Sequence, residues 1–144
     1  MIAGIDEAGR GPVIGPLVVC GILLDQKGLI ALQKLGVRDS KALSPHRREF
    51  LAAKILKIAK KAEIVEIPPS QIDAARKRNL LNELEAKTFA QIINSLKPSE
   101  AYVDSADANP AKFKERLKRY LEVPTELVVE NFADRTYIQV AAAS

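Results

Sequence analysis

This sequence of 144 residues has no tryptophan, one cysteine and one methionine, and aromatic residues make up only 5% of it. A lone cysteine, Cys20, excludes an intramolecular disulfide and favours a reducing compartment. An uncharged stretch, residues 12–24, is interrupted by Pro12 and Pro16. It is too short to span a membrane, and the acids that precede it are wrong for a signal peptide. We therefore expect a cytoplasmic protein that makes no use of a membrane.

The rest of the composition is that of a folded protein. Hydrophobic residues make up 47% of the chain and charged residues 28%, which argues against a disordered or fibrous protein and predicts an aliphatic core. The length is typical of one domain, and no repeat, low-complexity tract or linker divides it. We expect residues 1–144 to form a single domain.

Positive charge is in slight excess and is clustered. Lys and Arg number 22 against 18 Asp and Glu, for a net charge of +4. Between residues 41 and 61 only Glu49 opposes seven cations, and three more follow at 76–78. The pattern fits two interpretations: a surface for a polyanion, or the solvated face of a helix.

Apolar spacing and turn residues predict a mixed α/β arrangement. Two apolar runs, 2–6 and 13–24, are joined by a turn-rich segment and predict an antiparallel hairpin. Ser44-Pro45 is typical of a helix start, with apolar residues following at helical spacing as far as Ala62. Further strands are expected at 63–67, 100–105 and 126–129. Helices are expected after Pro68-Pro69, with Ser70 as the cap, over 81–96, and after Asn109-Pro110. An Ala-rich segment follows Asp134.

Carboxylates stand at or just beyond the ends of three expected strands: Asp6-Glu7, Asp104 and Asp134. Ligands gather at strand ends in layered α/β folds, so these acids could meet. An acid directly after an apolar strand lies where an unpaired charge is costly, and a metal would supply the missing partner. The side chains of adjacent residues in a strand point to opposite faces, so Asp6 and Glu7 can line one site only if the strand ends between them. Ala8-Gly9 is expected to interrupt the strand at this point.

The other candidate residues have simpler explanations. Asp107 is well placed to cap the helix near Asn109. Asp39 is expected to stabilise a turn, and Asp73 to cap a helix. His46, in the first turn of a helix, is expected to be exposed. Four carboxylates without a convergent His or Cys would form an all-oxygen site, which favours Mg²⁺ or Mn²⁺ over zinc or copper.

A long contiguous motif resembles the N-terminal signature of type 2 ribonuclease H, ribonuclease HII, in an archaeal-like form. The motif runs from Gly4 to Pro12 as Gly-Ile-Asp-Glu-Ala-Gly-Arg-Gly-Pro and continues at Gly15 to Val19. The resemblance extends through 38–43, 81–85, 102–107, 133–134 and 141–144, so it covers essentially the whole sequence.

The resemblance implies a ribonuclease H-like mixed β-sheet flanked by helices. It makes Asp6, Glu7, Asp104 and Asp134 the catalytic, metal-binding acids of a site for two Mg²⁺ or Mn²⁺ ions. The segment Gly9, Arg10 and Gly11 matches the part of the family that recognises the ribonucleotide, where glycines let the backbone approach a 2′-hydroxyl. Ser40 and Lys41 match a segment that holds a phosphate.

The implied activity is hydrolysis of the RNA strand of RNA–DNA hybrids, and cleavage 5′ of ribonucleotides embedded in DNA, by a monomer. Products would carry 5′-phosphate and 3′-hydroxyl ends. Family members usually continue into a further helix and a tyrosine-bearing motif, which this sequence lacks, so it is expected to be C-terminally short and weakly specific for the junction. Two alternatives stay open: a non-catalytic or weakly active duplex-binding fragment, and a related nuclease or strand transferase acting on DNA.

Overall fold

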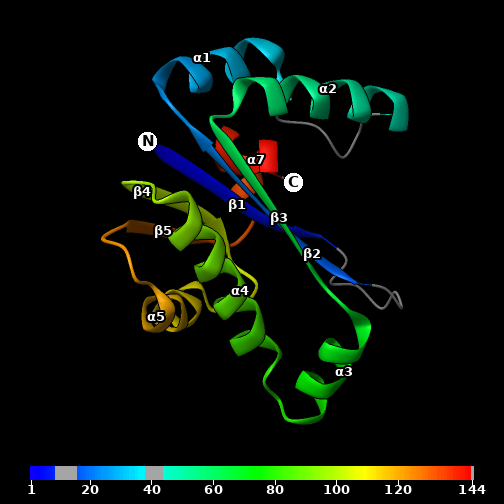
Figure 1. Ribbon diagram of the computed structural model, residues 1–144, viewed down its shortest axis with the longest axis vertical. Helices are drawn as coiled ribbons and strands as arrows, with labels where there is room; N and C mark the ends of the chain where they lie inside the picture. Colours follow the sequence, from blue (N-terminus) through cyan, green and yellow to red (C-terminus); the bar gives the residue numbers. More distant parts are fainter. Residues whose placement is uncertain (9–15, 38–43, 144) are drawn as a thin grey trace.

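The computed structural model describes residues 1–8, 16–37 and 44–143, and it contains a five-stranded mixed sheet (Figure 1). The strands lie in the order β3-β2-β1-β4-β5. β1 pairs antiparallel with β2 and parallel with β4, β2 pairs antiparallel with β3, and β4 pairs parallel with β5. The strands are β1 (Ile2–Ala8), β2 (Leu17–Leu24), β3 (Lys61–Ile67), β4 (Glu100–Asp104) and β5 (Glu126–Glu130).

The predicted N-terminal hairpin is confirmed, but β1 is longer than the sequence suggested. Its ladder with β2 runs from Ile2 to Ala8, whereas its ladder with β4 stops at Ile5. The strand therefore does not end between Asp6 and Glu7, and that expectation was wrong. Among the strands that the structure describes, β2 is the one that pairs with β1 beyond Ile5.

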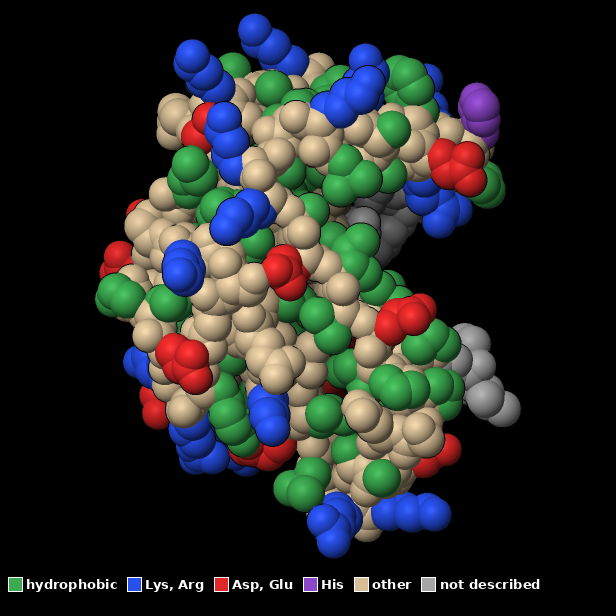
Figure 2. Space-filling model, viewed as in Figure 1, with side chains coloured by type: hydrophobic (Ala, Val, Ile, Leu, Met, Phe, Trp, Pro, Cys, Tyr) green, Lys and Arg blue, Asp and Glu red, His purple; other side chains and the backbone are tan. Residues whose placement is uncertain are grey.

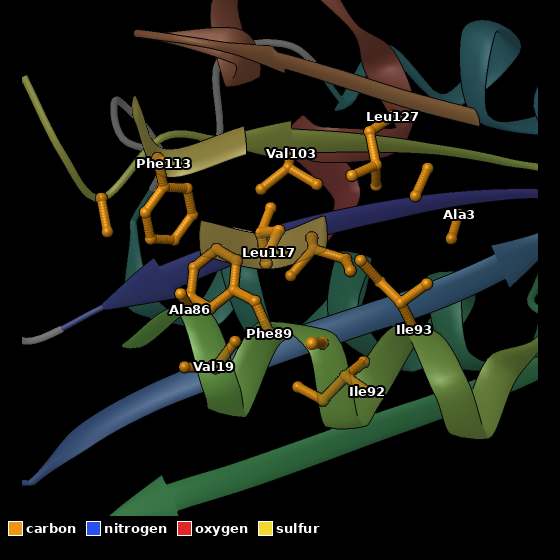
Figure 3. Packing of buried hydrophobic residues seen from close by; sticks show 14 of the residues in the cluster. Ala3, Val19, Ala86, Phe89, Ile92, Ile93, Val103, Phe113, Leu117 and Leu127 are labelled. Atoms are coloured by element: carbon orange, nitrogen blue, oxygen red, sulfur yellow. The ribbon is translucent and has the colours of Figure 1, made fainter. Parts of the chain in front are cut away.

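Helices α4 (Leu81–Leu96) and α5 (Pro110–Tyr120) cover one face of the sheet, and α3 (Pro69–Lys77) extends from it beyond β3. Figure 3 shows the core beneath them: Phe89, Ile92 and Ile93 of α4 point toward the strands, beside Phe113 and Leu117 of α5. The rings of Phe89 and Phe113 meet edge to face with centroids 5.3 Å apart. The apolar stripe predicted for residues 81–96 is thus the centre of the core.

The opposite face carries α1 (Gln26–Leu35), α2 (Pro45–Ile58), α6 (Ala133–Thr136) and α7 (Ile138–Ala143). Helix α7 packs across β1, where Gly4 has no side chain to obstruct it. Ser44 caps α2 as expected, its hydroxyl accepting from the backbone N–H of Arg47. Helix α1 was not expected, although Asp25 caps its start and Gly36 ends it with φ +66°.

Three local expectations were wrong. Pro68 precedes α3 and Pro69 takes its first position, so Ser70 and Asp73 both lie inside the helix and neither caps its start. Helix α2 ends at Ile58, and Ala62 belongs to β3. Asn109 itself caps α5, and Asp107 instead accepts from the Asn109 backbone and pairs with Arg116.

Among the described residues, none of the helices is both long enough and apolar enough to cross a membrane.

Candidate active site

Two carboxylates, Asp6 and Asp104, lie on neighbouring parallel strands, one residue beyond the last pair of their ladder. Ile5 of β1 is opposite Val103 of β4, so the residue after each stands at the same edge of the sheet. Parallel strands align their carboxyl ends, and this is why two acids far apart in the chain come together. Asp134 joins them from α6, which follows β5.

Hydrogen bonds hold both carboxylates. Asp6 Oδ1 accepts from the backbone N–H of Glu7 at 2.8 Å, and Asp104 Oδ1 accepts from the backbone N–H of Ala133 at 3.4 Å. The side chains of Asp6 and Asp104 also interact with each other, and the charge of Asp134 acts on both.

Burial raises the pKa of Asp6 to about 8, and the charges of Asp104 and Asp134 push it in the same direction. The Glu7 backbone N–H opposes this by stabilising the ionised form. Burial also raises the pKa of Asp104. Like charges crowded in a poorly solvated place cannot all ionise unless a cation joins them. The ionised carboxylates are therefore destabilised by burial and by mutual repulsion, and a bound cation would relieve both effects.

Asp6, Glu7 and Asp104 line one groove of about 500 Å³ between α2 and the sheet. Its apolar walls come from Leu51, Ala52 and Ile55 of α2 and from Ala141 and Ala142 of α7. Figure 2 shows the surface hollowed beneath α2, with Lys and Arg side chains gathered over α1 and α2 above it.

The chemistry of these side chains suits a hard divalent cation. All the donors are carboxylate oxygens, and Glu7 Oε2 is buried without a hydrogen-bond partner among the described residues. Oxygen donors of this kind are those that Mg²⁺ and Mn²⁺ prefer. Within the described ranges, however, no three Asp, Glu, His or Cys side chains stand in an arrangement that would hold a metal. The donors fit, and their side chains would have to rotate to form a ligand set.

The structure thus brings Asp6, Asp104 and Asp134 together and places Glu7 in the same groove. The other predicted site residues, Gly9, Arg10, Gly11, Ser40 and Lys41, lie outside the described residues. His46 is exposed, as expected.

Sequence reasoning did not single out Arg48, which lines the groove with the acids. The only signal for it was its membership of the cationic run at 41–61.

Comparisons with known proteins agree with this architecture. Among solved structures, the ribonuclease H2 of Pyrococcus horikoshii superposes with a TM-score of 0.89 at 42% identity, covering 99% of this chain and 67% of that one. Ribonuclease HII of Archaeoglobus fulgidus, solved as a complex with PCNA, gives a TM-score of 0.89 at 44% identity over the same shares. The fold is therefore ribonuclease H-like, as the sequence predicted.

The family model of ribonuclease HII matches residues 3–144. Ribonuclease HII of Methanocella arvoryzae is 48% identical over 144 residues, which cover 99% of this chain and 64% of that protein. The chain belongs to the ribonuclease HII family. It spans a little less than two thirds of the length of this curated relative.

Proposed function

We propose that this chain carries the catalytic site of a metal-dependent endonuclease that hydrolyses the RNA strand of RNA–DNA hybrids. We further propose that it cleaves 5′ of ribonucleotides embedded in DNA. Membership of the ribonuclease HII family supports the substrate class. The observation that carries the proposal is the position of the buried Asp6 beside the half-buried Asp104, where the ladder between the parallel strands β1 and β4 ends. Both carboxyls have raised pKa values.

In this proposal Asp6, Glu7, Asp104 and Asp134 hold two Mg²⁺ or Mn²⁺ ions. Bound ions of this kind lower the pKa of a water and stabilise negative charge on a leaving oxygen. The water oxygen attacks phosphorus and gives up a proton to the solvent. The bond from phosphorus to the 3′-oxygen breaks, and that oxygen takes up a proton from the solvent and leaves as a hydroxyl. The products therefore carry 5′-phosphate and 3′-hydroxyl ends.

Substrate contacts are assigned to two sets of residues. Gly9, Arg10 and Gly11 are proposed to read the 2′-hydroxyl, and Ser40 and Lys41 to hold a phosphate, on the strength of the sequence motif alone. Arg48 is a further candidate for a phosphate contact because it lines the groove beside the acids. A cytoplasmic location and a monomeric state, both expected from the sequence, stay proposals.

The deciding experiment compares four labelled duplexes in the presence of Mg²⁺ or Mn²⁺. These are an RNA–DNA hybrid, a DNA duplex with one ribonucleotide, an all-DNA duplex and an all-RNA duplex. We expect cleavage of the first two only, and loss of that cleavage with EDTA. The variant Asp104→Asn is the matched control, because it keeps the side-chain shape but removes one proposed ligand oxygen.

Each alternative has its own outcome. Equal cutting of the all-DNA duplex would identify a DNA nuclease and refute the substrate assignment. Binding of the hybrid without cleavage at any metal concentration would identify a duplex-binding module. Wild-type cleavage rates in Asp104→Asn would remove the acids from the mechanism even if the hybrid were cut.

A further inference from the structure

A network of side chains fastens the loop that directly follows Asp104. We call it the Asp107 cluster; its members are Asn82, Glu83, Asp107, Arg116 and Tyr120. Arg116 Nη1 lies 2.9 Å from Asp107 Oδ2, and Arg116 Nε lies 3.2 Å from Glu83 Oε1. Asn82 donates to Asp107 at 3.4 Å, and the Tyr120 hydroxyl donates to Glu83 at 2.6 Å. The cluster therefore joins the loop after β4 to both α4 and α5.

The backbone of this loop is tied at several points. The N–H of Ser105 donates to the carbonyl of Glu130 at 2.9 Å, and the Ser105 hydroxyl donates to the Asp107 carbonyl at 2.6 Å. Asp107 Oδ1 accepts from the N–H of Asn109 at 3.0 Å. Asn131 Nδ2 reaches the carbonyl of Ala108 at 2.9 Å. Asp107 therefore makes two kinds of contact. Its Oδ1 stabilises the turn of the loop itself, and its Oδ2 connects the loop to the neighbouring helices.

Arg116 is the centre of the cluster and cannot be replaced by another cation without loss. It contacts two different acids with two different nitrogens, and its side chain is only 22% exposed. A planar guanidinium can bridge two carboxylates at fixed angles, whereas a lysine ammonium is a single flexible point charge. Arg119 makes a useful contrast, since it also reaches Glu83, at 3.4 Å, but is 68% exposed and is not joined to Asp107.

This fastening matters for the site because the backbone groups that interact with the Asp104 carboxylate come from outside its own loop. They are the N–H of Ala133, at 3.4 Å, and the N–H of Phe132. These contacts orient the carboxylate, while the backbone at the end of β4 depends on the loop that follows it. To bind a cation together with Asp6, Asp104 must present its carboxylate from a backbone that stays in place. Groups that orient ligands from outside the site typically change metal affinity by about 10-fold to 100-fold when removed.

We propose that the Asp107 cluster is a positioning device that holds the end of β4 so that Asp104 can bind a divalent cation together with Asp6. Asp107 and Arg116 act through the backbone of residues 105–107 and do not touch the substrate or the reacting atoms. The inference rests on the proposed function, because it assumes that Asp104 is a metal ligand.

The test measures Mn²⁺ binding by isothermal titration calorimetry, well below the thermal midpoint of each variant. Asp107→Asn keeps shape but breaks the ion pair, and Arg116→Lys keeps charge but cannot bridge. Each should weaken Mn²⁺ binding by about 10-fold, the lower end of the range for such partners. Arg119→Ala, the control, should bind Mn²⁺ as the wild type does. Circular dichroism checks that each protein is folded, and Arg116→Lys carries the test if Asp107→Asn does not fold.

The outcomes separate this inference from the proposed function. Wild-type Mn²⁺ affinity in both Asp107→Asn and Arg116→Lys, in a protein that binds Mn²⁺ and cleaves hybrids, would overturn only the role of the cluster. Equal weakening in Arg119→Ala would also overturn it, since general loss of charge near Glu83 would then explain the effect. A wild-type protein that binds no Mn²⁺ would overturn both.

Discussion

The packing of α7 against β1 predicts that Gly4→Ala is severely destabilising. A Cβ atom added to Gly4 would lie 2.1 Å from the carbonyl oxygen of Gln139, 2.3 Å from its carbonyl carbon and 2.8 Å from the nitrogen of Val140. All three atoms belong to the backbone of α7, so no side-chain rotation relieves the overlap.

The size of the effect follows from the movement required. Real Cβ contacts are essentially never closer than 3.0 Å, so α7 must move away by about 0.9 Å, the difference between 3.0 and 2.1 Å. Inserting a methyl group into a packed core typically costs about 1–3 kcal/mol, and a clash with backbone belongs at the upper end. A loss of about 3 kcal/mol is a large share of a total stability of roughly 5–15 kcal/mol. Because Ala141 and Ala142 of α7 line the groove with the acids, cleavage should fall as well.

Gly21→Ala is the matched control, since Gly21 lies opposite Ile5 in the same hairpin. Its added Cβ would lie 2.4 Å from Ile92 Cγ2 and 3.2 Å from Leu96 Cδ1, both of them side-chain atoms. Ile92 is β-branched and buried in a helix, so it can give way only by local repacking, whereas the backbone of α7 must move as a unit. The cost should therefore be smaller than for Gly4→Ala, about 1–2 kcal/mol. Urea denaturation of both variants measures the difference in free energy of unfolding. If Gly4→Ala unfolds at the same urea concentration as Gly21→Ala or later, the reasoning about α7 fails.

Three further predictions concern the site and the pH dependence of stability. Asp104→Asn should reduce cleavage by more than about 100-fold, the upper range for merely supporting residues, while hybrid binding in a gel-shift assay is retained; unchanged cleavage would remove Asp104 from the site. Mg²⁺ or Mn²⁺ at a hundredfold excess over its dissociation constant should stabilise the protein by about 2.7 kcal/mol. This corresponds to a rise of roughly 8 °C in the thermal midpoint. An unchanged thermal midpoint would show that the acids do not bind the metal ion. The Gly28 backbone N–H holds the pKa of Asp25 below its usual 3.8. The ionised Asp25 cap therefore stabilises the fold above pH 3.8, and this stabilisation is lost as the pH falls through the pKa of Asp25 in the folded protein. A difference in thermal midpoint between wild type and Asp25→Ala that persists unchanged at pH 2 would contradict this.

The elements that were predicted correctly are those with strong local signals. Ser44-Pro45 and Asn109-Pro110 start α2 and α5 because a polar cap followed by proline satisfies the geometry of a first turn. The stripe of α4 was recognisable because it is long and strictly periodic. Where local signals competed, prediction failed: at α3 the prolines placed the helix start ahead of Ser70.

The candidate acids could be selected from the sequence because each follows an apolar strand and because a long motif resembles one family. Their arrangement could not be predicted in the same way. Nothing local states that the β1–β4 ladder stops at Ile5, or that Glu7 lines the same groove as Asp6 although β1 continues to Ala8. The Asp107 cluster was likewise hidden, since Asp107 alone looks like a helix cap.

By itself the sequence determined the strands, most of the helices, the ribonuclease HII family and the short set of carboxylates worth considering, because these depend on neighbouring residues and on a contiguous motif. Only the tertiary structure decided which acids meet and which distant residues hold them. Those outcomes depend on the register of β1 against β4, on α7 crossing β1 at Gly4, and on Arg116 reaching across from α5. Such contacts join residues far apart in the chain, and their energies exist only once the whole sheet and its helices have packed.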